Sequence, residues 1–285
     1  MITEIMDSQL NLPFHRRRRN VFSQCGEDGV VDYLLDLANI RDGYFVEFGA
    51  WDGRHLSNCA NLADRGWGGC FIEGDSERFL ELRKNYAART DIATVNAFVG
   101  TEGNHALASI LKAAGAPSEP TILSIDIDGM DYHIWASLTA YQPLMCVVEF
   151  NPTIPARVAY VQENDEAVHR GSSLRAFWRL AQQKGYALVA ATDWNGFFMR
   201  EDVCRARAVP TYAPEQVKDP RYETLLFHGF DGTLFAAGSR NLLWHGIEIG
   251  ETELQLLPAE LRRFPPCAPA WYSDAFARFK RARSG

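Results

Sequence analysis

Acidic residues stand at the ends of several apolar runs in this sequence. Glu47 and Glu73 close the first two of these runs, and Asp126, Asp128 and Glu149 end later ones. If the runs are parallel strands, their carboxyl ends meet at one edge of a sheet, where such sheets bind ligands. We therefore expect these carboxylates to line a binding site.

A glycine-containing turn follows the first acid. Gly49 and Gly53 permit a tight turn and let backbone N–H groups approach a ligand closely. Their spacing differs from the GxGxxG dinucleotide fingerprint, which disfavours a nicotinamide oxidoreductase. An acid at the end of the second strand, here Glu73, can accept hydrogen bonds from both hydroxyls of a ribose. Together with the turn after Glu47, it predicts an adenosine-type ligand.

The later acids indicate a second kind of chemistry. Residues two apart on a strand share a face, so Asp126 and Asp128 are expected to point the same way, as are Glu149 and Asn151. On neighbouring strands these oxygen-bearing side chains would meet at one rim. Such hard oxygen ligands suit Mg²⁺, and we take Asp126, Glu149 and Asn151 as its candidate ligands. A bound cation would lower the pKa of an acceptor hydroxyl and orient it.

Other roles for the same residues stay open. Asp126 could only orient an amine of the ligand, Asp128 could cap the next helix, and Asn151 could begin the turn before a proline. The candidate catalytic residues are Asp126, Asp128 and His133. The histidine stands near the start of the next helix, and its ordinary pKa lies close to neutrality.

The pattern of apolar residues predicts the elements that position these side chains. Apolar runs of strand length alternate with stretches of helical spacing, which implies an α/β fold with a mostly parallel sheet and helices on both faces. We expect about seven strands, with an antiparallel hairpin closing the sheet. The expected strands are 44–48, 69–73, 92–99, 121–127, 144–150, 186–191 and 197–200. The expected helices are 27–39, 57–64, 77–88, 106–113, 131–138 and 174–184.

Three regions of the chain differ in character. Residues 1–22 are expected to form an irregular arm, in which the basic run 15–19 is solvated, with contact to an anion or a membrane surface as the alternative. Residues 23–203 carry the alternating pattern and form the predicted core. Residues 204–285 are interrupted by prolines, and their end, 274–283, is expected to form either a basic amphipathic helix or a frayed tail. We expect this C-terminal extension to pack on the core.

Bulk composition narrows the class of protein. The 285 residues are 47% hydrophobic and 23% charged, as in well-packed globular proteins. A net charge of −7 disfavours binding to nucleic acid. No apolar window reaches the roughly 20 residues that span a bilayer, and no secretory signal is seen, so we expect no stable membrane insertion. The six cysteines form no CxxC pair and suit free thiols in the cytoplasm. The sequence leaves open whether the protein forms a homodimer.

Several blocks of the sequence together resemble the FkbM-like methyltransferases. They lie within residues 23–203 and include SQCGEDG, VEFGAWDG, GWGGCFIEGD, VNAFVG, LSIDIDGMDYHIW, VVEFNP and GSSLRAFWRLAQQKGYALV. The resemblance implies a class I methyltransferase fold, which is Rossmann-like, and a transferase that binds S-adenosyl-L-methionine. It also implies O-methylation of a small-molecule or glycan acceptor, such as a sugar or a secondary metabolite.

The resemblance implies roles for individual residues in cofactor binding. Glu47 and the turn after it would hold the methionine part, Glu73 the ribose, and Asn96 with Ala97 the adenine edge. Gln24 would lie over the same pocket. The implied cofactor-binding set is Gln24, Glu47, Gly49, Ala50, Trp51, Gly53, Ser57, Glu73, Asn96, Ala97 and Asp126.

Two details of the resemblance bear on activity. Trp51 stands where family members more often carry a small polar residue, and its indole could stack beside the cofactor or partly close the pocket. A non-catalytic cofactor-binding or interaction module of the same fold is therefore the alternative. The acids of the fourth and fifth strands are similar to the metal site of catechol O-methyltransferase, in which a strand-four acid and a strand-five Asp-Asn pair hold the metal.

Overall fold

The computed structural model describes residues 12–283 of the chain. The chain divides into two compact units, with the boundary between Asp219 and Pro220. The first unit contains the alternating strands and helices, and the second contains two short hairpins and a C-terminal helix. Of the predicted N-terminal arm, residues 1–11 lie outside the described residues.

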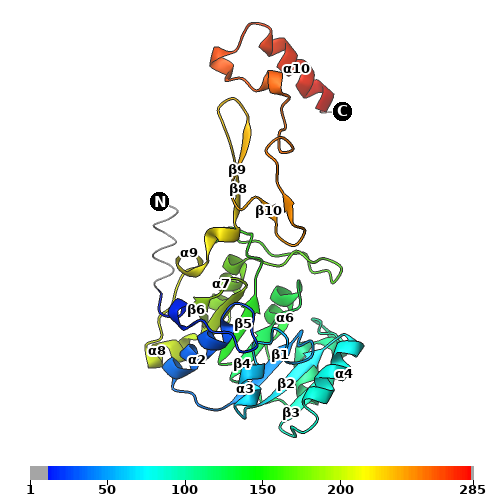
Figure 1. The fold of residues 1–285 in the computed structure, drawn as a ribbon, viewed down its shortest axis with the longest axis vertical. Coiled ribbons are helices and arrows are strands. Elements are labelled where there is room, and N and C mark those ends of the chain that lie inside the picture. The colour runs from blue at the N-terminus through cyan, green and yellow to red at the C-terminus, as the bar shows by residue number, and fades with distance from the viewer. Residues whose placement is uncertain (1–11, 284–285) are drawn as a thin grey trace. The chain divides into compact units, whose positions relative to one another are not determined.

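A seven-stranded sheet forms the centre of the first unit (Figure 1). Its strand order is β3-β2-β1-β4-β5-β7-β6, and β7 runs antiparallel to both of its neighbours. With helices around it, this sheet confirms the predicted class I methyltransferase fold, including the closing hairpin. The strands are β1 (Tyr44–Phe48), β2 (Gly68–Glu73), β3 (Ile92–Asn96), β4 (Ile122–Ile125), β5 (Met145–Glu149), β6 (Tyr186–Ala191) and β7 (Asn195–Arg200).

The pairing register brings the ends of four strands to one level. Phe48 of β1 pairs with Ile72 of β2 on one side and with Ile125 of β4 on the other. Ile125 in turn pairs with Val148 of β5. The residues that follow these four therefore meet at the carboxyl edge of the sheet, and they are Gly49, Glu73, Asp126 and Glu149.

The central strands are buried on both faces, which explains why their sequences are continuous apolar runs rather than alternating ones. Every residue of β4 is buried, and so are most residues of β1 and β5. Aromatic packing continues beside β7, where Trp135 lies 5.2 Å from Phe198 and 6.4 Å from Phe177, measured between ring centroids. This close packing makes the interior of the first unit rigid.

Helices connect the strands of the first unit, and one of them begins three residues after its predicted start. The helix expected from residue 57 begins at Ala60 instead. The Ser57 hydroxyl accepts the N–H groups of Cys59 and Ala60 and donates to Glu47, so Ser57 lies in a turn ahead of the helix. The helices are α2 (Glu27–Ala38), α3 (Ala60–Asp64), α4 (Ser76–Asn85), α5 (Leu107–Ala113), α6 (Asp131–Ser137), α7 (Leu174–Gln183), α8 (Glu201–Arg207) and α9 (Pro214–Val217), with short turns η1 (His15–Arg17) and η2 (Gly103–His105).

The basic segment before α2 is anchored to the first unit. Phe14 is 1% exposed and packs edge-on against Tyr212, with ring centroids 5.9 Å apart. Arg18 forms an ion pair with Asp193 at 2.7 Å. Other arginines of the run are exposed, as expected. The expectation of a solvated run is therefore wrong at Arg18, because a partly buried ion pair holds that side chain.

The second unit buries few of its apolar side chains. Ala236, Leu261 and Tyr272 are buried, whereas Phe230 and Trp244 are 88% and 61% exposed. Of the two alternatives for 274–283, the structure has the basic helix. The elements are η3 (Pro220–Tyr222), β8 (Thr224–His228) paired with β9 (Leu234–Gly238), β10 (Asn241–Leu242) paired with β11 (Ile247–Glu248), η4 (Ala259–Leu261), η5 (Pro265–Cys267) and α10 (Tyr272–Arg283).

Two expectations from composition concerned free thiols and membrane insertion, and the cysteines and helices of the structure bear on them. All six cysteines are free thiols, as predicted, and four of them are buried. None of the helices between residues 12 and 283 has both the length and the apolar character that crossing a bilayer requires.

We expect Phe14→Ala to lower the free energy of unfolding by about 3–5 kcal/mol, the usual cost of removing a buried phenylalanine side chain. Equilibrium denaturation followed by circular dichroism measures this change. Val21→Ala is the matched control, because Val21 lies in the same segment and is 47% exposed. An equally small cost for both substitutions would contradict the anchoring of this segment.

Candidate active site

The turn after β1 uses left-handed backbone at three positions. Gly49, Trp51 and Gly53 have φ angles of 73°, 51° and 75°. A Cβ atom on Gly49 would lie 1.7 Å from the carbonyl oxygen of Asp126. Glycine is therefore required at this position for two reasons, its φ angle and the close approach of the two backbones. The turn after β1 consequently lies directly against the loop after β4.

Glu47 is buried at the end of β1, and the segment after the turn holds its carboxylate. The Ser57 hydroxyl donates to Oε2 at 2.5 Å, and the N–H of Asn58 donates to Oε1 at 2.8 Å. Burial raises the pKa of Glu47 to about 7, although these hydrogen bonds oppose the rise. A nearby cation would favour the charged form of such a carboxyl.

Glu73 is buried at the end of β2, and backbone amides hold both of its oxygens. The N–H of Trp51 donates to Oε2 and the N–H of Asp75 donates to Oε1, each at 2.7 Å. The turn after β1 thus reaches β2 through the backbone of its tryptophan. Each carboxylate oxygen has a further lone pair that can accept another donor, such as a sugar hydroxyl.

The Trp51 indole is held by side chains outside this hydrogen-bonded turn. The guanidinium carbon of Arg78, on α4, lies 3.7 Å from the indole ring centroid. The His55 ring packs edge-on at 5.1 Å, and the indole remains 40% exposed. A left-handed non-glycine residue costs about 1–2 kcal/mol, and a cation–π contact offsets part of that cost.

The residues predicted for the adenine edge surround the backbone of Glu73. The Asn96 amide and the N–H of Ala97 both donate to the Glu73 carbonyl, at 2.9 and 3.1 Å. Phe98 was not among the predicted residues, yet it is 73% exposed beside them. A Cβ atom on Gly74 would lie 2.6 Å from its ring. The signal in the sequence is an aromatic residue just past a strand end.

Gln24 lies in the loop before α2. Gln24 is exposed, and its backbone carbonyl accepts a hydrogen bond from the side-chain amide of Asn20 at 2.9 Å. The loop is fastened to the start of α2 by Asp28, which accepts the N–H of Ser23 at 2.9 Å. The role of Gln24 over the cofactor stays a prediction.

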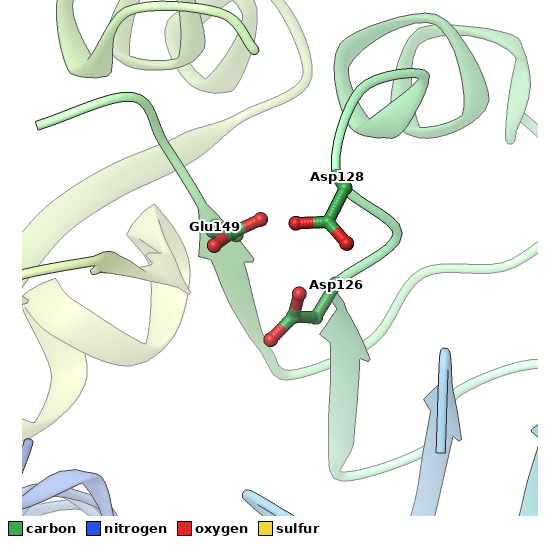
Figure 2. A group of neighbouring side chains, drawn as sticks. All are labelled: Asp126, Asp128 and Glu149. Atoms are coloured by element: carbon green, nitrogen blue, oxygen red, sulfur yellow. The ribbon is translucent and has the colours of Figure 1, made fainter. Parts of the chain in front are cut away.

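Three carboxylates meet at the ends of β4 and β5 (Figure 2). Oxygens of Asp126, Asp128 and Glu149 all lie within 4.8 Å of one another. Burial, together with the charges of Asp131 and Asp128, raises the pKa of Asp126 to about 7. Burial and the charge of Asp126 also raise the pKa of Glu149 well above its usual range. Near neutral pH, the pair formed by Asp126 and Glu149 therefore shares a proton unless a cation replaces it.

Asp131, which was not among the predicted residues, shapes the loop after β4. It is buried and accepts the N–H groups of Ile127 and Gly129 at 3.0 and 2.9 Å. Because β4 ends at Ile125, Asp126 and Asp128 lie in this loop, and Asp128 has a φ of 59°. Their carboxylates therefore meet through a bent loop, and the predicted strand alternation is wrong here. Asp128 does not cap α6, whose N-cap residue makes no side-chain bond.

Asn151 and His133 make contacts away from the three carboxylates. The Asn151 oxygen accepts the N–H and the hydroxyl of Thr153 at 2.9 and 2.7 Å, and its amide donates to the Arg170 carbonyl at 2.7 Å. These bonds match the alternative in which Asn151 begins a turn. His133 Nε2 is bonded to the Gln162 carbonyl at 2.9 Å.

Comparisons with known proteins give only distant similarities. No family model and no curated protein matches the chain. One similar solved structure is the CMeT domain of the citrinin polyketide synthase, at 10% identity and a TM-score of 0.42 over 61% of this chain and 51% of that chain. This chain thus spans about half of that one (51%).

Two further solved structures are similar at the same level. A TehB-like SAM-dependent methyltransferase from Corynebacterium glutamicum has 11% identity and a TM-score of 0.40 over 64% of this chain and 89% of that chain. The N-terminal domain of EvdMO1 with SAH bound has 9% identity and a TM-score of 0.40 over 60% and 78%. Because these identities and TM-scores are low, we base no conclusion about function on them.

The raised pKa of Asp126 predicts how stability depends on pH. Its pKa is about 7 in the folded chain against an ordinary value of 3.8, so the folded state binds the proton more tightly. The free energy of unfolding should therefore fall as pH rises from about 4 to 7, by at most about 1.4 kcal/mol per pH unit for each such group. Asp126→Asn should make this decline shallower. Denaturation curves between these pH values measure both slopes, and equal slopes for variant and wild type would contradict the assignment.

Proposed function

We propose that this chain is an S-adenosylmethionine-dependent methyltransferase that methylates a hydroxyl of a sugar, a glycan or a secondary metabolite. The observation that carries the proposal is the meeting of Glu47, Glu73 and the glycine turn at the carboxyl edge of a class I sheet. The acceptor class rests on the FkbM-like resemblance of the sequence. When bound, S-adenosylmethionine supplies a sulfonium methyl group that an acceptor nucleophile displaces.

The residues at this edge suit the parts of such a cofactor. Glu73 retains lone pairs for the ribose hydroxyls, and the exposed Phe98 ring offers a face for the adenine to stack on. Glu47 offers a buried carboxylate to the amine of the methionine part. The two glycines keep the turn free of side chains where a Cβ atom would collide with neighbouring groups.

Asp126 is the proposed proton acceptor for the acceptor hydroxyl. A general base works best when its pKa lies near the operating pH, and burial sets the pKa of Asp126 at about 7. Above this pH the pair with Glu149 can take up a proton, and Asp128 lies beside them. His133 stays an alternative base, although its Nε2 is engaged by a backbone carbonyl.

A divalent cation is the second part of the proposal. Asp126, Asp128 and Glu149 would hold Mg²⁺, which prefers oxygen ligands and would polarise an acceptor hydroxyl. Asn151 drops out of the predicted ligand set, because both ends of its amide are engaged in a turn. A cation and a shared proton are alternative ways of relieving the repulsion among these carboxylates.

A non-catalytic cofactor-binding module is the second candidate function. It is favoured by Trp51, whose bulky side chain stands in the turn proposed to hold the methionine part. Such a module would bind S-adenosylmethionine but would form no S-adenosylhomocysteine with hydroxylated acceptors. A panel of sugars, glycans and phenols, assayed for S-adenosylhomocysteine release, separates the two candidates.

Glu73→Ala should weaken the binding of S-adenosylhomocysteine by at least about 10-fold, because hydrogen bonds from ribose to a charged acceptor are worth about 1.5–3 kcal/mol. Isothermal titration calorimetry measures the affinity of wild type and variant. Glu77→Ala is the matched control, since Glu77 is an exposed acid on the first turn of α4. Absence of measurable binding to wild type at millimolar ligand would sink the proposed function.

Mg²⁺ should raise the melting temperature of the wild type if the three carboxylates hold it, because a ligand at about 100 times its Kd stabilises a protein by about 2.7 kcal/mol. Asp128→Asn should abolish this rise, and chelator should reverse it. Glu81→Gln, a change at an exposed acid on α4, should leave the rise intact. A wild type that does not respond to Mg²⁺ and works fully in excess chelator would show that the carboxylates hold a proton instead.

A further inference from the structure

Asp28, in the SQCGEDG segment, uses one carboxylate oxygen for all of its side-chain hydrogen bonds. Oδ2 accepts the N–H groups of Val21, Phe22 and Ser23 at 2.8, 2.9 and 2.9 Å, and the Ser23 hydroxyl at 2.8 Å. The residue is 1% exposed. Its other oxygen, Oδ1, is buried and has no hydrogen-bond partner among residues 12–283. Asp28 therefore holds the loop before α2 through one carboxylate oxygen, and its second oxygen is left without a donor.

The preceding residue, Glu27, shows that this segment can satisfy a buried acid completely. Glu27 is 0% exposed, and its Oε2 accepts the N–H of Cys25 at 2.6 Å. Its Oε1 accepts the Thr192 hydroxyl at 2.6 Å and the Asn195 amide at 3.4 Å. These bonds tie the start of α2 to the turn between β6 and β7. The free oxygen of Asp28 is thus not a general consequence of its place at the start of α2.

The start of α2 lies at the carboxyl edge of the sheet, because Glu27 accepts the hydroxyl of Thr192, the residue that directly follows β6. The negative charge of Asp28 contributes to the raised pKa of Glu47, after the larger effect of burial. Both carboxylates also act on the buried Cys59 thiol, whose pKa is raised chiefly by burial. Two neighbouring buried carboxylates are costly unless a cation or further donors lie with them.

We propose that the free oxygen of Asp28, together with Glu47, binds the α-ammonium group at the amino-acid end of the cofactor. The proposal rests on the proposed function and deepens it, because it assigns the SQCGEDG segment to that end of the ligand. A primary ammonium carries a positive charge and three N–H donors, which suit a buried acceptor oxygen beside a second carboxylate. Asp28 also positions Gln24, because the Asp28 carboxylate accepts the backbone N–H groups of the three residues that precede Gln24.

The test compares S-adenosylhomocysteine with its des-amino analogue, which lacks only the ammonium group. Wild type should bind S-adenosylhomocysteine about 10- to 100-fold more tightly, as expected for a charge-assisted hydrogen bond at a buried site. Asp28→Asn is nearly isosteric, because the amide oxygen can keep the bonds to the loop while an NH₂ group replaces the free oxygen. In this variant the preference should fall below about threefold, with the affinity for the des-amino analogue unchanged. Calorimetry on the full chain measures all four affinities.

A control and a second variant complete the experiment. Asp32→Asn, on the same helix, removes an acid that pairs with Arg19 and Arg65 and should change neither affinity. Asp28→Glu keeps the charge but displaces the free oxygen, so it too should reduce the preference and serves if the Asn variant does not fold.

Three results would overturn the proposal. The first is a wild type that does not distinguish the two ligands. The second is a folded Asp28 variant that keeps the full preference. The third is an equal loss of both ligands with a lowered melting temperature, which would mean that Asp28 acts only by holding the loop. Failure of wild type to bind either ligand would instead contradict the proposed function itself, and the proposal would fall with it.

Discussion

The burial of carboxylates at one edge of the sheet is the constraint on which the rest of the structure depends. A buried carboxylate is costly unless donors or a cation surround it. Glu27, Glu73 and Asp131 meet this requirement with hydrogen-bond donors from backbone and side chains. One buried oxygen of Asp28 has no donor among residues 12–283, and the partly exposed carboxylates of Asp126 and Glu149 lie close enough to repel each other. Those shortfalls mark the places where a ligand, a proton or a cation would complete the structure.

The turn after β1 links these places mechanically. Its Gly49 touches the backbone of Asp126 on one side, and its Trp51 donates to Glu73 on the other. The groups proposed to hold the cofactor and the groups proposed to accept the proton therefore share one support. A side chain that widened this turn would displace both sets of groups together. The position of the cofactor and the position of the Asp126 carboxylate therefore both depend on this one turn.

The central sheet was predictable because its strands are apolar on both faces and alternate with helices. The acids at the strand ends followed from the same reasoning, since strand ends meet at one edge. The makeup of the acid cluster did not follow, because Asp131 bends the loop after β4 and so ends the strand at Ile125. Periodicity carries no information about such a bend. The exposure of Phe98 and the spare oxygen of Asp28 likewise depend on three-dimensional packing, which residue types alone do not describe.

The sparse core of the second unit has a consequence for how the chain opens. Resistance to local opening comes mainly from buried apolar contacts, and Leu226 and Phe227 on β8 are 60% and 53% exposed. The hairpin of β8 and β9 can therefore separate at a lower free-energy cost than any strand in the middle of the large sheet. Its amide hydrogens would exchange with deuterated solvent first, and proteases would cut there while the large sheet is still intact.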